Sequence, residues 1–299
     1  MNFNISELDL TVNPHLLVKF RGLRVPCPKC GKKYQYFCRV CNIDLLPTLC
    51  AQFNIPAAQY TIPSITLPIK TTILLSELED YESSSIPFIS CLPVSNLQCK
   101  RFNDSFNDVE PNSALLMPGP DSIHVSELPN SVKNLYIIDC KWYQCSRLLQ
   151  NSPELNKLQK VVLNNYTSQF WRPHGRKFEG CLSSAECVYY ASKELSLRSG
   201  SNSNGSGSNS IGSGGNLCDE NNTCENNTHG GKNIDDLLTY YANNILIVKR
   251  YLFGRNIKHI NKDRESRVVY ENWEEIKKGV EARWGSLEGE GKEEENMQE

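Results

Sequence analysis

Four cysteines near the amino end are spaced to bind one metal ion. Cys27-Pro-Lys-Cys30 and Cys38-Arg-Val-Cys41 form two Cys-x-x-Cys pairs that are close together in the chain. Four thiolates at this spacing can surround one tetrahedral ion, and Gly31 has the backbone freedom that a knuckle turn requires. Thiolate ligands favour zinc, with iron as the alternative. Four cysteines leave no open coordination position, so the pattern predicts a structural zinc site, with Cys50 as a weaker candidate ligand.

A second candidate site begins where a short apolar run ends. Residues 135–138 (Leu-Tyr-Ile-Ile) are followed by Asp139 and, three positions later, by Trp142. Such a run is typical of a buried strand in a parallel sheet, and side chains just past its carboxyl end face the crevice where α/β proteins bind ligands. Asp139 and Trp142 would offer a carboxylate and a stacking face to one molecule. Alternatively, Asp139 caps the next helix and Trp142 packs beneath it.

Three further segments contain residue types suited to ligand binding. Pro118-Gly119-Pro120 is a turn that would let the backbone approach a ligand, or that serves only as a turn. Residues 170–177 interleave aromatic and basic side chains, which suits RNA bases and phosphates unless the segment is a solvated loop. Residues 182–186 (Leu-Ser-Ser-Ala-Glu) contain a capping box, with Ser183 and Glu186, that would start a helix whose first N–H groups can hold a carboxylate.

The elements that must position these residues are predicted from apolar runs. Strands are expected at 65–75, 86–92, 113–117, 135–138 and 161–163, and helices at 143–149, 183–195, 234–253 and from a capping box at Asn272 and Glu275. Ten residues separate the first two strands, which is short for a parallel crossover. Either these two strands are not parallel or a segment is missing between them.

Composition divides the chain into five parts. We expect a lead-in and zinc knuckle at 1–50, an α/β domain at 51–198, a disordered Ser/Asn/Gly-rich insert at 199–231, helices completing the domain at 232–287, and an acidic disordered tail at 288–299. The net charge of −2 excludes attraction of the whole protein to nucleic acid, so an RNA site must be a local basic patch. The odd count of 13 cysteines, with neither a signal peptide nor a long apolar run, predicts a reducing compartment and no membrane association.

Five motifs in order resemble the DTW-domain family, the tRNA-uridine aminocarboxypropyltransferases, and most closely its eukaryotic nuclear-type branch. They are the four-cysteine pair, Met117-Pro-Gly-Pro-Asp-Ser122, Ile137-Ile-Asp-Cys-Lys-Trp-Tyr-Gln144, Phe170-Trp-Arg172 and Leu182-Ser-Ser-Ala-Glu-Cys-Val-Tyr-Tyr190. The resemblance implies a SPOUT-related, knotted α/β fold, with a mostly parallel sheet and helices on both faces. It also implies a location in the nucleus, in the cytoplasm, or in both, with the nucleus favoured. The 3-amino-3-carboxypropyl group of S-adenosylmethionine would move to N3 of a uridine in tRNA, releasing methylthioadenosine.

The resemblance also assigns roles to individual residues. Asp139 matches the Asp of the family's Asp-x-Thr-Trp motif and would act as the base, or as the positioning group, for N3, while Trp142 would shape the pocket. Contacts to the cofactor are implied for Pro118, Gly119, Pro120, Asp139, Leu182, Ser183, Ser184 and Glu186. Contacts to tRNA are implied for Lys141, Arg172, Arg176 and Lys177.

The sequence departs from the family pattern at two places. Lys141 stands where the family has Thr, and a pair with Asp139 would lower the pKa of that carboxyl and make it a poorer base. The family's His-Pro-x-Glu…Lys-Ser-Thr segment is represented only by residues 76–85. Two alternative functions therefore stay open: methyl transfer from the same cofactor, and RNA binding by a catalytically inactive zinc-knuckle protein.

Overall fold

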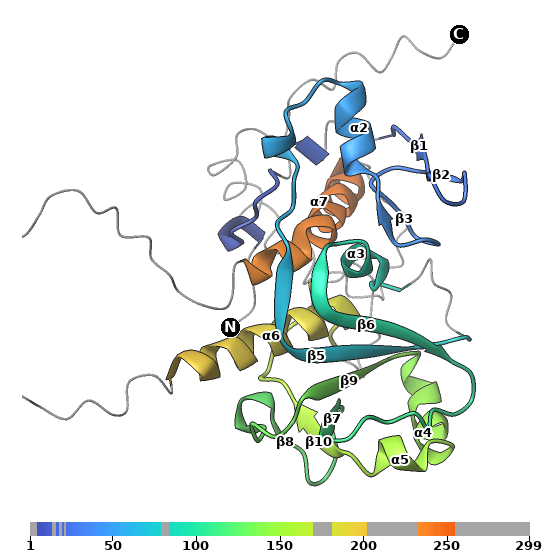
Figure 1. Cartoon of the computed structure of the whole chain (residues 1–299), viewed down its shortest axis with the longest axis vertical. Coiled ribbons are helices and arrows are strands. Elements are labelled where there is room, and N and C mark those ends of the chain that lie inside the picture. The colour runs from blue at the N-terminus through green and yellow to red at the C-terminus, as the bar shows by residue number, and fades with distance from the viewer. Residues whose placement is uncertain are drawn as a thin grey trace, which may run out of the picture.

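The computed structural model describes residues 5–13, 16–17, 20, 22–78, 84–169, 181–201 and 233–254. A six-stranded sheet lies at its centre, with strand order β6-β5-β9-β7-β10-β8 and parallel pairing between all neighbours (Figure 1). The strands are β5 (Ile65–Ser76), β6 (Val94–Phe102), β7 (Ser113–Leu116), β8 (Ile123–His124), β9 (Asn134–Asp139) and β10 (Gln159–Val162). The parallel α/β sheet predicted from the sequence is confirmed, and a knot stays a prediction.

Helices cover both faces of the sheet because its central strands are apolar on both sides. In β9, Leu135 and Ile137 join one hydrophobic cluster, whereas Tyr136 between them joins another. The larger cluster includes side chains of α2 (Leu46–Gln52), α3 (Pro87–Ser90), α6 (Ser184–Ser201), η6 (Ile234–Leu238) and α7 (Thr239–Gly254). The smaller cluster lies under α4 (Trp142–Gln150) and α5 (Pro153–Asn156).

Short elements complete the described part of the chain. They are η1 (Ile5–Glu7), β1 (Val25–Pro26), β2 (Lys33–Tyr34), β3 (Phe37–Cys38), β4 (Ile43–Asp44), η2 (Ala57–Gln59) and η3 (Val125–Glu127). Strand β1 pairs with β2, and β3 with β4, both antiparallel. Across the described residues, no helix has both the length and the hydropathy needed to cross a membrane.

The strand predicted at 86–92 is wrong, because this run forms the helix α3 instead. Pro87 occupies the first turn, which favours a helix start, and Phe88 and Ile89 are buried. The next strand along the chain is β6, which pairs in parallel with β5. The connection therefore spans residues 77–93 and contains α3, so the shortage inferred from strand spacing came from the misplaced strand.

The amino-terminal lead-in is fixed to the start of the carboxyl-terminal helices by two acidic side chains. The backbone N–H of Asp9 donates to Asp235 at 2.9 Å. Thr11 donates to Asp236 through its N–H and its hydroxyl, both at 2.7 Å. The helix predicted at 234–253 is thus present as η6 followed by α7, and it shares one core with the lead-in.

Several sequence predictions lie outside the described residues. They are the basic and aromatic segment at 170–177, most of the insert at 199–231, the helix expected after Asn272, and the acidic tail. The helix α6 runs to Ser201, a little past the predicted start of the insert.

Candidate functional site

The four predicted metal ligands come together in one cluster. The sulfur atoms of Cys27, Cys30, Cys38 and Cys41 all lie within 4.8 Å of one another. A tetrahedral zinc ion with Zn–S bonds of ~2.3 Å requires sulfur separations of roughly 3.8 Å, so small adjustments suffice. The cluster could therefore bind a metal ion such as zinc. Cys50 does not belong to it.

Two equivalent turns build this cluster. In the first, Gly31 has φ +72° and its N–H donates to the carbonyl of Cys27 at 2.9 Å. In the second, Asn42 has φ +53° and its N–H donates to the carbonyl of Cys38 at 2.8 Å. Glycine and asparagine tolerate this left-handed conformation, so each Cys-x-x-Cys pair is followed by the residue type that its turn needs.

The pKa values of the thiols in the cluster are shifted in opposite directions. Burial raises the pKa of Cys27, but hydrogen bonds from the backbone of Cys30 and Lys29 outweigh burial and lower that pKa to about 7. Burial and the neighbouring thiols raise the pKa of Cys41 to about 12. Four thiolates this close repel one another, and a bound cation removes the repulsion, so metal binding would release protons.

The carboxylate of Asp139 lies at the carboxyl end of β9 and accepts hydrogen bonds from two serine hydroxyls. Ser84 donates to its Oδ2 atom at 2.6 Å, and Ser184 donates to its Oδ1 atom at 2.6 Å. These are lengths typical of charge-assisted hydrogen bonds. Ser84 follows β5, the strand that pairs with β9, and Ser184 is the first residue of α6. The contacts fix the orientation of a half-buried carboxylate at one edge of the sheet.

Sequence reasoning missed Ser84 and Ser85, both of which lie in the connection after β5. Besides the Ser84 contact, the hydroxyl of Ser85 accepts a hydrogen bond from the N–H of Ala185 at 3.0 Å. The segment interpreted as deficient thus supplies two contacts that join Asp139 to the start of α6. The sequence does contain a signal for these contacts, namely a run of serines after the strand β5. Because β5 and β9 are parallel neighbours, residues that follow them lie at the same edge of the sheet.

The predicted capping box is confirmed and is wholly buried. The N–H of Ser183 donates to Glu186 at 2.8 Å, and the N–H of Glu186 approaches the Ser183 hydroxyl at 3.4 Å. Glu186 also accepts from the hydroxyl of Ser168 at 2.7 Å and from the N–H of Gln169 at 2.6 Å. Its carboxylate thereby holds the segment after β10 against the start of α6.

The other predicted ligand-binding residues that the structure describes follow β7 and β9 at the same sheet edge. The Pro118–Pro120 turn follows β7, the other neighbour of β9, and Gly119 passes so close to Lys160 that an added Cβ would lie 2.6 Å from its Cδ. Lys141 is the N-cap of α4, and its side chain is exposed and forms no ion pair within the described residues. Trp142 begins α4. Arg172, Arg176 and Lys177 lie outside the described residues.

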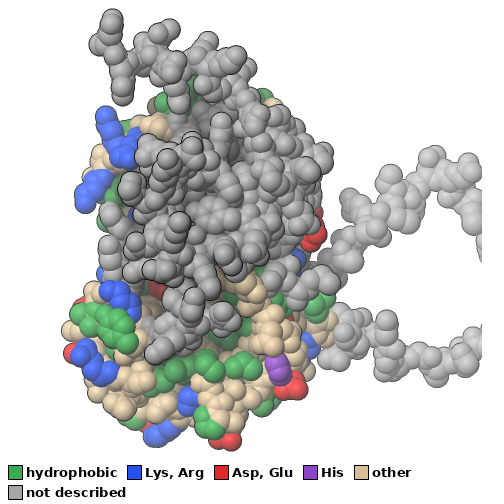
Figure 2. Space-filling model, turned by 180° about the vertical axis from the view of Figure 1, so that it is seen from behind, with side chains coloured by type: hydrophobic (Ala, Val, Ile, Leu, Met, Phe, Trp, Pro, Cys, Tyr) green, Lys and Arg blue, Asp and Glu red, His purple; other side chains and the backbone are tan. Residues whose placement is uncertain are grey.

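The surface carries no continuous basic face in the view of Figure 2. There, the blue Lys and Arg side chains are separated by polar and hydrophobic ones over the described part of the molecule. This agrees with the net charge of −2, so contact with a polyanion must depend on local groups.

We expect Glu186→Gln to lower the free energy of unfolding by about 2–3 kcal/mol, because hydrogen bonds to a buried charged group are stronger than neutral ones. In this variant, the NH₂ group of the new side-chain amide would face the backbone N–H of Ser183 or of Gln169. Two donors cannot form a hydrogen bond with each other, so one of these contacts is lost. Urea denaturation measures the change. Glu154→Gln is the matched control, since Glu154 only pairs with the exposed Lys157, and a change below about 0.5 kcal/mol is expected. Equal effects of the two substitutions would contradict the assigned role of Glu186.

Comparison with known proteins identifies the family of the chain. A family model described as DTW domain matches residues 27–209, which is more than half of the chain. The chain therefore belongs to the DTW-domain family. It is also similar to tRNA-uridine aminocarboxypropyltransferase 1 of Xenopus tropicalis, with 21% identity over 230 residues that cover 62% of this chain and 75% of the relative. No solved structure matches it.

Proposed function

We propose that this protein transfers the 3-amino-3-carboxypropyl group of S-adenosylmethionine to N3 of a uridine in tRNA. The observation that carries the proposal is the Asp139 carboxylate, which Ser84 and Ser184 hold at the carboxyl ends of the parallel strands, where α/β proteins generally bind ligands. Membership of the DTW-domain family supports a transferase, and the name of the Xenopus relative supports tRNA uridine as the acceptor.

The chemistry is a displacement at carbon. A bond forms between N3 and the terminal carbon of the transferred group, the carbon–sulfur bond breaks with its electron pair going to sulfur, and N3 loses its proton. The co-substrate supplies an activated carbon and a neutral leaving group, methylthioadenosine. The protein must align N3, carbon and sulfur and exclude water. Asp139 would accept the N3 proton or orient N3, depending on how closely the base approaches it.

The polar groups at this edge fit the proposed co-substrate in chemical type. Asp139 offers a carboxylate to an ammonium or N–H group, whereas the Ser84 and Ser184 hydroxyls already donate their protons to Asp139. The N–H groups of Ala185 and Glu186 already have acceptors in Ser85 and Ser183, so the start of α6 would contribute mainly side chains. Backbone contacts would come from the turn at Pro118–Pro120, and Trp142 would take the role in binding that the family resemblance implies.

The test is incubation of the full-length protein with S-adenosylmethionine and unmodified tRNA, followed by mass spectrometry of the digested nucleosides. The expected products are aminocarboxypropyl uridine and methylthioadenosine in equal amounts. S-adenosylhomocysteine would instead identify methyl transfer. A protein that binds tRNA without consuming the co-substrate would be the inactive RNA-binding alternative, which Lys141 in place of the family's Thr favours.

A further inference from the structure

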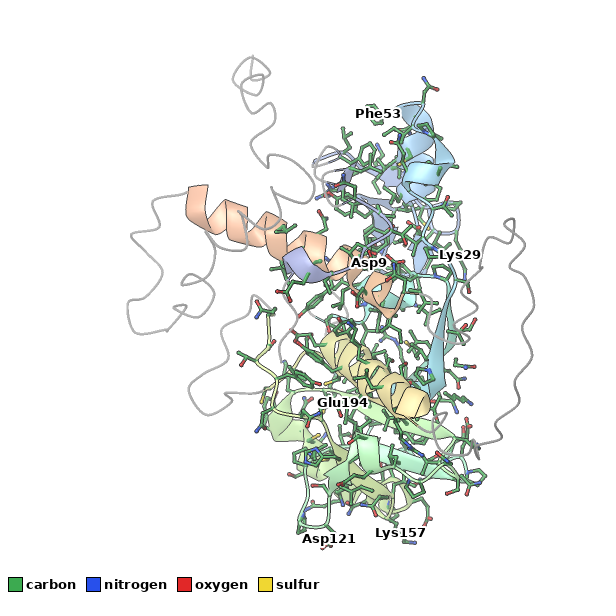
Figure 3. The ribbon with its side chains drawn as sticks, turned by 90° about the vertical axis from the view of Figure 1, so that its left-hand side faces the viewer. Asp9, Lys29, Phe53, Asp121, Lys157 and Glu194 are labelled. Carbon is green, nitrogen blue, oxygen red and sulfur yellow. The ribbon has the colours of Figure 1, made fainter. Side chains whose placement is uncertain are left out.

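A groove opens at the edge of the sheet opposite to Asp139. Its volume is about 560 Å³, and it lies between the amino-terminal part of β5, the segment that leads into β9, and the last turns of α6. Figure 3 views the molecule from the side on which α6 ends. The lining residues used below are Lys70, Asn130, Lys133 and Arg198.

The lining of the groove has an excess of positive charge. Among the described residues that line it, three are cationic and none is acidic. Lys70 is neutralised by Glu110, at 2.5 Å between Nζ and Oε1. Lys133 is exposed, Arg198 is half-buried, and neither forms an ion pair within the described residues. The Arg198 guanidinium instead donates to the side-chain oxygen of Asn130, which holds it beside the groove.

The fold accounts for only part of this arrangement. A basic residue such as Arg198 is favoured in the last turn of a helix by the helix dipole. Lys133 directly precedes the first residue of β9 and has no such reason to be cationic. Lys70, Lys133 and Arg198 come from segments far apart in the sequence and meet around one concavity. That combination suits a ligand with several negative charges.

We propose that this groove binds the phosphate backbone of the RNA substrate, an inference that rests on the proposed function for the identity of that RNA. The strand β9 runs from the groove at Asn134 to Asp139, a distance of about 17 Å at ~3.3 Å per residue. A folded tRNA is larger than this separation, so one molecule can contact both edges. Two cations here supply local attraction that the net charge of −2 does not.

The experiment measures binding of an unmodified tRNA transcript to the full-length protein over a series of salt concentrations, without co-substrate. The test variant is Lys133→Gln/Arg198→Gln. The control, Lys32→Gln/Arg24→Gln, removes the same charges from exposed positions outside the groove that form no ion pair within the described residues. We expect the groove variant to bind about ten-fold more weakly, with a salt slope shallower by about 1.8, since each lost phosphate contact reduces the slope by ~0.9. Lys133→Arg/Arg198→Lys should restore the slope, because it keeps both charges.

The outcomes distinguish RNA binding in the groove from the transfer reaction at Asp139. In the transfer assay, the groove variant should raise KM with little change in kcat, because the groove lies at the other edge of the sheet from Asp139. A groove variant that binds like the wild type, or a control that loses as much affinity, overturns the proposal. Wild-type protein that binds tRNA but transfers nothing overturns the proposed reaction, while the groove is then judged on binding alone.

Discussion

Asp139→Asn should reduce the rate of group transfer by about 10²- to 10⁴-fold, the range typical of a lost general base. The substitution keeps the size of the side chain. Its Oδ1 can still accept from one serine hydroxyl, and its amide can donate to the other hydroxyl after that hydroxyl rotates. The pair Ser84 and Ser184 therefore stays in place, and tRNA binding should change little. Single-turnover kinetics with nucleoside detection measures the effect.

The pH dependence of the remaining activity distinguishes a base from a positioning group. If Asp139 removes the N3 proton, the rate of the wild-type protein rises with pH as the Asp139 carboxyl loses its proton. This rise disappears from the pH–rate profile of Asp139→Asn. If Asp139 only orients N3, the profile keeps its shape at a lower amplitude. Ser184→Ala removes one of the two serine hydrogen bonds to the carboxylate and should lower the transfer rate about ten-fold, as expected for a mispositioned group. Full activity of Asp139→Asn would rule out both roles.

The parts of the fold that the sequence predicts well depend on local chemistry. The two cysteine turns are specified by Gly31 and Asn42, the start of α6 by Ser183 and Glu186, and β9 by an unbroken apolar run. In each case the residues that form the element are neighbours in the sequence, so their types report directly on their conformation.

The parts that were missed depend on contacts between distant segments. The run at 86–92 is apolar and short, and such a run does not distinguish a buried helix from a buried strand. Strand β6 is an outermost strand of the sheet, and most of its residues are partly or fully exposed. It therefore lacks the apolar pattern of an inner strand. The hydrogen bond from Ser84 to Asp139 joins residues 55 positions apart, and only the parallel order of β5 and β9 brings them together.

The metal cluster and Asp139 are connected through one set of aromatic side chains. Phe37, which precedes the third cysteine, packs edge-on against Phe88 of α3, with ring centroids 5.5 Å apart. Phe88 packs in turn against Tyr241, at 6.0 Å. The Tyr241 hydroxyl accepts a hydrogen bond from Ser183 at 3.1 Å, one residue before the serine that binds Asp139. A change in the knuckle can therefore reach the start of α6.

Cys38→Ser should abolish metal binding, because it removes one of the four cysteine ligands. It should also destabilise the whole domain. Cys38 is fully buried within the main hydrophobic cluster. Structural zinc sites contribute on the order of 10 kcal/mol to folding, so loss of one ligand should cost more than about 3 kcal/mol. We propose zinc as the bound ion, at one equivalent per chain in the wild-type protein. Elemental analysis and thermal unfolding measure the two effects, and a chelator should reproduce the second.

Cys50→Ala is the matched control, because Cys50 is as buried as Cys38 but does not belong to the four-cysteine metal cluster. Burial and the nearby carboxylate of Asp44 raise the pKa of Cys50 to about 11, so its thiol is neutral and acts only as a packing group. This control should keep one equivalent of zinc and lose about 1 kcal/mol of stability. Through Phe37, Phe88 and Tyr241, loss of zinc should also lower the transfer rate in protein that stays folded. A Cys38→Ser protein with unchanged zinc content and unfolding temperature would exclude a four-cysteine zinc site.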